Sequence, residues 1–129
     1  KTLRTVARRA DAWNTSGSLE EVSDALATLA DHCSAVARDI AAIEKTVSFP
    51  IVIDDDAASA RGRMDALTAS NGVTNMGPVP HLAGPPADVA DAIRPYQDLG
   101  FETVIVRMPA PYDRQTIDRI GEVAALLDR

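Results

Sequence analysis

The chain has 129 residues, of which 46% are hydrophobic and only 4% aromatic, so we expect one domain with a core of Ala, Val, Ile and Leu. Its formal net charge of −6 disfavours nucleic acid and anionic membranes as partners, because both bind basic patches. No apolar run reaches the length of a membrane span, and a single cysteine excludes an internal disulfide framework and a cysteine-based metal site. These features favour a cytoplasmic protein.

The chain opens directly with a helical pattern. Its apolar stripe consists of Leu3, Val6, Ala7 and Ala10. Because this helix begins on the first residue, with neither an initiator Met nor a cap before it, we expect a piece of a longer chain; a processed or tagged chain is the alternative. Residues 10–14 then predict a short strand that carries Trp13 and Asn14 at its carboxyl end.

A capping box marks the start of the next helix, with Ser18 as N-cap and Glu21 three residues later. The apolar positions of this helix fall on one face and are Val22, Leu26, Leu29, Cys33 and Val36. This spacing predicts that Cys33 packs in the core, while His32 flanks the stripe without a visible partner.

Residues 46–53 predict a second strand, in which Pro50 should cause an irregularity because it has no N–H to donate. Asp54, Asp55 and Asp56 follow directly, before a helical run from Ala57 to Leu67. We interpret the three carboxylates as helix caps that complement the helix dipole. A divalent-metal site is the alternative, although no further acidic residue or His stands at metal-loop spacing.

The most informative stretch runs from Ala83 to Pro111, after a turn-rich segment over 70–83. Pro86 predicts the first turn of a helix, and Gly100 predicts its C-terminal stop. The apolar stripe of this helix contains Val89, Ile93 and Tyr96. Val104–Val106 is apolar on both faces, which is typical of a strand buried between two layers, and Arg107 stands at its carboxyl end.

A last helix should begin after Asp113 as N-cap, with an apolar stripe of Ile117, Ile120, Ala124 and Leu127. The predicted order is helix, strand, helix, strand, helix, helix, strand, helix. This alternation indicates an α/β fold with parallel strands joined by right-handed crossovers. In such folds ligands bind at the carboxyl ends of the strands, which makes Trp13, Asn14 and Arg107 candidate site residues.

Residues 1–14, Lys-Thr-Leu-Arg-Thr-Val-Ala-Arg-Arg-Ala-Asp-Ala-Trp-Asn, resemble the segment that follows the glycine-rich loop of luciferase-like monooxygenases. The tail resembles the last β/α unit of that family, with a Gly-Thr-Pro-type helix start, a Gly-led strand that ends in Arg, and Pro-Tyr-Asp. The resemblance runs from Lys1 to Leu127 and is closest to the actinobacterial coenzyme F420-dependent branch. Arg9 stands where an aromatic residue is common, and Pro85 replaces the capping Thr or Ser, which leaves the branch open.

The resemblance implies the C-terminal portion of a (β/α)8 TIM barrel, with residues 1–129 as one partial barrel domain. About three parallel strands with flanking helices would belong to it: Ala10–Asn14, Thr46–Ile53 and Phe101–Met108. It implies an oxidoreductase or monooxygenase that transfers hydride at a flavin or deazaflavin ring, with coenzyme F420 or FMN as cofactor and a small-molecule substrate.

The resemblance also assigns roles to residues. Lys1, Thr2 and Asn14 would bind the cofactor, and Trp13 and Arg107 the substrate. No catalytic residue and no metal ligand is assigned, because the family's remaining site residues lie in its first half; the isolated chain should therefore be inactive. For Trp13 the alternative is core packing, and for Arg107 it is a salt bridge to a neighbouring helix.

Two other functions stay open. A non-catalytic α/β module that binds a partner or another copy of itself fits a partial barrel, because open sheet edges favour self-association into a homo-oligomer. A metal hydrolase that uses Asp54–Asp56 and His81 is the remote third possibility.

The side chains of the last strand should alternate between its two faces. The period of two in a strand groups Thr103, Ile105 and Arg107, and the charge of Arg107 predicts that this group points into the barrel, while Val104 and Val106 face the helices.

Overall fold

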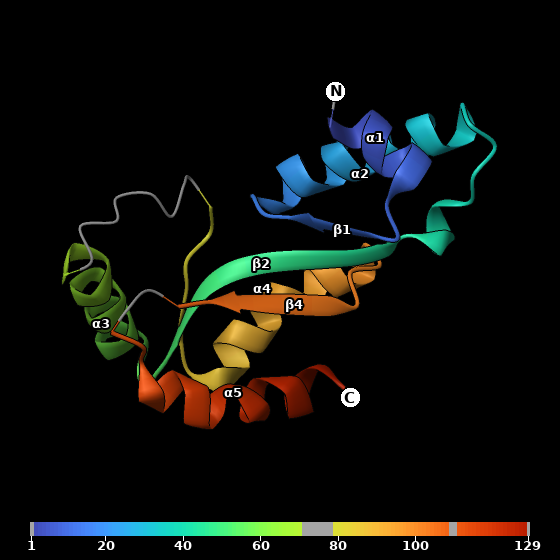
Figure 1. The fold of residues 1–129 in the computed structure, drawn as a ribbon. Coiled ribbons are helices and arrows are strands. Elements are labelled where there is room, and N and C mark those ends of the chain that lie inside the picture. The colour runs from blue at the N-terminus through green and yellow to red at the C-terminus, as the bar shows by residue number, and fades with distance from the viewer. Residues whose placement is uncertain (1, 71–78, 109–110, 129) are drawn as a thin grey trace. The chain divides into compact units, whose positions relative to one another are not determined.

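The computed structural model describes residues 2–70, 79–108 and 111–128 (Figure 1). The elements in chain order are α1 (Thr2–Arg9), β1 (Ala12–Thr15), α2 (Leu19–Ser34), the short 3-10 helix η1 (Ile40–Ala42), β2 (Glu44–Ile53), α3 (Ala57–Ser70), β3 (Leu82–Gly84), α4 (Pro86–Asp98), β4 (Thr103–Arg107) and α5 (Arg114–Leu127). Two compact units divide the chain. The first unit comprises residues 1–48 and 96–105, and the second unit comprises 49–95 and 106–129.

The sheet is built on β2, the long green strand of Figure 1. β1, β3 and β4 each pair with β2. β1 and β3 run parallel to β2, in registers that begin at Ala12↔Glu44 and at Ile51↔Leu82. Parallel strands that alternate with helices confirm the predicted α/β class.

β2 is also the strand that is buried on both faces, since every residue from Thr46 to Ile53 is buried. The sequence-based prediction gave this property to Val104–Val106 of β4, and that was wrong. Ile105 is 43% exposed, and Val104 and Val106 are only half-buried. Both strands are apolar, but three strands pair with β2, and an apolar run does not reveal which strand is central.

Pro50 interrupts the hydrogen-bond ladder as its missing N–H requires. The pairing with β1 ends at Val47, and the pairing with β3 begins at Ile51. Pro50 lies between the two ladders, so the expected irregularity takes the form of a change of partner rather than a break in the strand.

In the first unit, α1 lies against α2 (Figure 1). The predicted capping box is confirmed: Glu21 N–H donates to Ser18 Oγ at 3.2 Å, and Ser18 N–H donates to Glu21 Oε2 at 2.8 Å. Cys33 is only 1% exposed and packs in the core as expected. Val36 was placed on the same stripe but is 38% exposed, because α2 has already ended at Ser34.

Gly100 ends α4 in the predicted way, with a φ of +89° that side-chain-bearing residues avoid. Phe101 N–H donates to Tyr96 O at 3.1 Å, and Gly100 N–H donates to Gln97 O at 2.7 Å. These two bonds form a Schellman motif, which satisfies the last carbonyls of the helix and turns the chain into β4.

In the second unit, Pro86 is the first residue of α4, and Val89 and Ile93 are buried as predicted. β3 was missing from the sequence-based prediction, because a strand of three residues is too short to show an alternating pattern. The turn prediction for Asn71–Gly72 and Gly77–Pro78 lies outside the described residues.

The buried face of α5 differs from the predicted one. Ile117 is 48% exposed and Ala124 is exposed, whereas Thr116 and Val123 are buried. The buried face is therefore turned by one residue from the predicted stripe. The reason is Thr116, whose hydroxyl is bound inside the second unit and holds the helix in this orientation.

Candidate functional site

Polar residues stand at or just after the carboxyl ends of three strands. In the first unit these are Asn14 and its neighbour Trp13 on β1; in the second unit they are the carboxylates after β2 and Arg107 at the end of β4. In parallel α/β folds this edge of the sheet is where ligands bind, so each group has to be judged by its contacts.

Asn14 is exposed, and its side chain is held by the neighbouring strand. Thr46 Oγ1 donates to Asn14 Oδ1 at 2.9 Å, and the two residues are partners in the β1–β2 ladder. This bond uses the carbonyl oxygen of the amide and leaves its two N–H donors unused. In the described part of the chain no acceptor binds them, so Asn14 can donate to a ligand oxygen or nitrogen.

Trp13 is 7% exposed and packs against Phe101, with ring centroids 5.8 Å apart and ring planes tilted by 48°. This is the core packing that the alternative interpretation expected. Contact of Trp13 with a substrate stays a prediction.

Arg107 is the last residue of β4, at the predicted end of the strand, and is half-buried. Its Nε and Nη2 atoms are buried, and no described residue accepts a hydrogen bond from them. The alternative salt bridge to a helix carboxylate does not occur among residues 2–70, 79–108 and 111–128. A buried guanidinium without an acceptor is unfavourable, and an oxyanion ligand is the group that would satisfy it.

The face of β4 is only partly as predicted. Thr103 and Ile105 are exposed, and Val104 and Val106 are half-buried, so exposure alternates along the strand. Arg107 is half-buried and does not share the exposure of Thr103 and Ile105. The direction of Arg107 into a barrel stays a prediction.

Arg63 organises the region after β2, and the sequence alone did not single it out. It forms ion pairs with Asp54 at 2.9 Å and with Asp113 at 3.3 Å, and it donates to Gln115 Oε1 at 2.8 Å and to the carbonyl of Ile53. A search for opposite charges four residues apart could not have found it, because its partners lie in two other stretches of the chain, 53–54 and 113–115.

The acidic run after β2 has two roles where one was predicted. Asp56 caps α3, since its Oδ1 accepts from Ala58 N–H at 2.8 Å and from Ser59 N–H at 3.2 Å. Hydrogen bonds from Ser59 and then from Ala58 lower the pKa of Asp56. Asp54 instead pairs with Arg63, and Asp55 pairs with Arg119 at 2.8 Å.

The other predicted site residues are less informative. Lys1 lies outside the described residues, and Thr2 is the exposed first residue of α1. His81 is exposed. Across the described ranges, no three His, Cys, Asp or Glu side chains come together as a metal site would need, and no helix there has the length and apolar character to cross a membrane.

No protein-family model and no curated protein sequence matches the chain. Solved structures do. Riboflavin lyase (RcaE), solved with modified FMN and riboflavin, matches with a TM-score of 0.75 and 14% identity, over 98% of this chain and 40% of that one. EDTA monooxygenase (EmoA) from Chelativorans sp. BNC1 matches with a TM-score of 0.68 and 16% identity, over 98% and 41%.

A third structure, the coenzyme F420 dependent tetrahydromethanopterin reductase from Methanopyrus kandleri, has a TM-score of 0.63 and 15% identity, over 84% of this chain and 42% of that one. The fold is that of part of a (β/α) barrel. This partial barrel spans about two fifths of the length of each of these structures, and at such low identity the likeness establishes the fold alone.

Proposed function

We propose that the chain is the C-terminal part of a luciferase-like oxidoreductase that transfers hydride at a flavin or deazaflavin ring. The observation that carries the proposal is the shared fold with enzymes whose names specify FMN, coenzyme F420 or a monooxygenase reaction. The motifs over residues 1–14 and over the tail support the same family independently of the fold.

The cofactor in this proposal is coenzyme F420 or FMN, which when bound would accept or donate the hydride. The start of α1, with Lys1 and Thr2, would bind its phosphate, because a helix start presents free N–H groups and a positive dipole end. Asn14 would donate a hydrogen bond to a polar edge of the ring. Its fixed amide orientation suits this role, since Thr46 already occupies the carbonyl oxygen.

Arg107 is proposed to bind a carboxylate or phosphate of a small-molecule substrate. Two buried nitrogen atoms of Arg107 have no acceptor among the described residues, which supports this role, because a planar guanidinium binds such groups through two parallel hydrogen bonds. Trp13 is proposed to line the substrate side of the end of β1, where its packing on Phe101 would hold the neighbouring Asn14 in position.

The test is a fluorescence titration of FMN and of F420 against the natural protein that contains this sequence, with Asn14→Ala as the variant. We expect the affinity for one of the two cofactors to fall about tenfold, the value of one well-placed hydrogen bond. Thr28→Ala is the matched control, because Thr28 is exposed on α2 and donates only to its own helix.

An unchanged affinity and rate in Asn14→Ala would leave Asn14 with a structural role only, as the strand residue that pairs with Thr46. If the natural protein bound neither cofactor, the oxidoreductase proposal would fail, and a non-catalytic interaction module would become the better explanation.

A further inference from the structure

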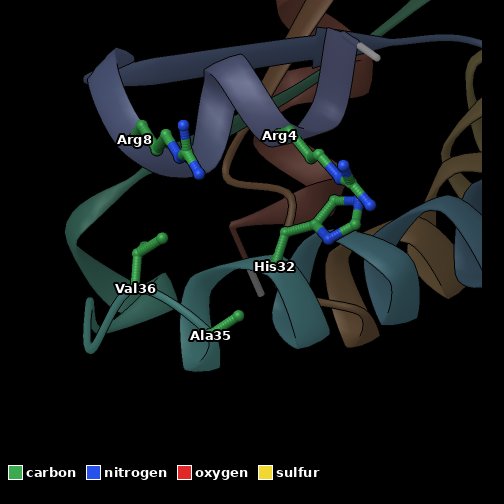
Figure 2. A pocket seen from close by; sticks show the side chains of 5 residues that line it. All are labelled: Arg4, Arg8, His32, Ala35 and Val36. Carbon is green, nitrogen blue, oxygen red and sulfur yellow. The ribbon is translucent and has the colours of Figure 1, made fainter.

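A basic pocket lies between α1 and the end of α2, wholly within the first unit. It is lined by Arg4 and Arg8 of α1 and by His32, Ala35 and Val36 of α2 and the turn after it, and its volume is about 190 Å³. Figure 2 shows the side chains of Arg4 and Arg8 on α1 and of His32 on α2, which line the pocket.

The basic groups of this pocket have no acidic partner. Among the described residues, no carboxylate forms an ion pair with Arg4, Arg8 or His32, although the protein carries six more negative than positive charges. Arg63, Arg94 and Arg119, by contrast, each pair with a carboxylate. Two guanidinium groups around one hollow repel each other, and an anion between them would relieve this repulsion.

The two helices that carry these groups are held together independently of the pocket. Ala7 of α1 is fully buried, so this helix is packed beside the face that carries Arg4 and Arg8. Arg38 donates to the carbonyls of Ala7 at 3.3 Å and of Ala10 at 2.7 Å, at the C-terminal end of α1. This contact satisfies carbonyls that would otherwise repel an anion, and it fixes the helix that bears Arg4 and Arg8.

Backbone hydrogen bonds also close the end of α2. Ala35 N–H donates to Asp31 O, and Arg38 N–H donates to Cys33 O, both at 3.0 Å, while Ala37 has a φ of +52°. These bonds close the helix end as a left-handed turn does. These backbone hydrogen bonds therefore already fulfil part of the structural role that His32 could have at the end of α2.

We propose that this pocket binds a phosphate group, with Arg4 and Arg8 as the charged donors and His32 as a third. Guanidinium groups match the geometry of phosphate oxygens through paired hydrogen bonds. The pocket is open and polar, and its size admits a phosphate together with the first atoms of the group that bears it. It lies along the flank of α1, so it is distinct from the proposed cofactor contact at the start of that helix.

The test uses inorganic phosphate and nuclear magnetic resonance of the 129-residue chain. Phosphate should shift the side-chain signals of Arg4, Arg8 and His32 in a saturable way, whereas an equal ionic strength of chloride should not. The variant Arg4→Gln/Arg8→Gln should weaken phosphate binding at least about tenfold. Both side chains are exposed, so circular dichroism should show that the variant still folds.

The matched control is Arg61→Gln/Arg114→Gln, which also removes two positive charges, but from exposed positions in the second unit. An equal loss of phosphate binding in both double variants would show that only the net charge of the protein matters, and it would overturn the proposal. So would the absence of saturable shifts.

Discussion

At the residue scale, Thr116 is the group whose role the sequence hid most completely. It looked like a polar residue at the start of an amphipathic helix, yet it is fully buried. Its hydroxyl accepts from Ile53 N–H at 2.8 Å and donates to Asp113 Oδ2 at 2.6 Å. Periodicity alone could not have predicted this, because the partner is a backbone N–H more than sixty residues away.

Thr116→Val keeps the shape of the side chain but removes both hydrogen bonds. We expect the free energy of unfolding to fall by about 1–3 kcal/mol, because the N–H of Ile53 is left buried without an acceptor. Urea unfolding measures the change. Thr28→Val is the control, since its hydroxyl is exposed; an equal loss there, or no loss at Thr116, would contradict the assigned role.

Asp56 predicts a dependence of stability on pH. Its folded-state pKa lies below the unfolded value of about 3.9, so its contribution is fully present above that value and is lost as the pH falls through the folded pKa. The stability difference between the wild type and Asp56→Asn should therefore stay constant from neutral pH to about 4 and shrink below it.

Urea unfolding at a series of pH values measures this difference. Asp118→Asn is the control, because its exposed carboxylate has no hydrogen bond in the described chain; its difference from the wild type should change less with pH. A difference for Asp56→Asn that stays flat in acid would show that the cap does not depend on the charge.

At the scale of the elements, the signals that are local in sequence were the reliable ones. The capping box at Ser18 and the glycine stop at Gly100 appear as predicted, because each depends on residues a few positions apart. The central position of β2 and the buried face of α5 depend on which distant segments pack against them. An apolar pattern shows that one face of a helix or strand is to be buried, but it does not show which other element will pack against that face.

Two glycines should respond in opposite ways to alanine. Gly100→Ala forces a side chain into a φ of +89° and brings Cβ to 3.3 Å from Lys45 Cε, so we expect a loss of about 1–2 kcal/mol. Gly62→Ala, inside α3 with nothing within 4 Å of the new atom, should gain about 0.5–1 kcal/mol. Thermal unfolding measures the change in the free energy of unfolding for both variants. Changes of the same sign would refute the argument from backbone conformation.

At the scale of the whole molecule, the candidate site residues were predictable in their place along the strands but not in their contacts. The alternation of helices and strands placed Asn14 and Arg107 at strand ends, and the structure places them there. The hydrogen bond from Thr46 and the missing acceptors at Arg107 depend on side-chain geometry that no local pattern encodes.

The last prediction concerns the 129-residue chain by itself: it should self-associate and bind FMN or F420 weakly or not at all. Ile105 of β4 is 43% exposed, and the described strands form an open sheet in which β1 and β4 each pair with β2 and not with each other. Open edges and exposed apolar strand faces favour pairing with another copy. A cofactor of this size needs an enclosing site, and this chain spans about two fifths of the structures that it resembles.

Analytical ultracentrifugation over a range of concentrations measures the association, and a fluorescence titration measures each cofactor. Ile105→Thr keeps the β-branched shape and lowers the exposed apolar area, so it should shift the equilibrium toward the monomer. His81→Gln, at an exposed polar position just before β3, serves as the control because it leaves the apolar surface of β4 unchanged. A stable monomer that binds either cofactor at micromolar affinity would show that the open sheet is sufficient, and both parts of the prediction would then be wrong.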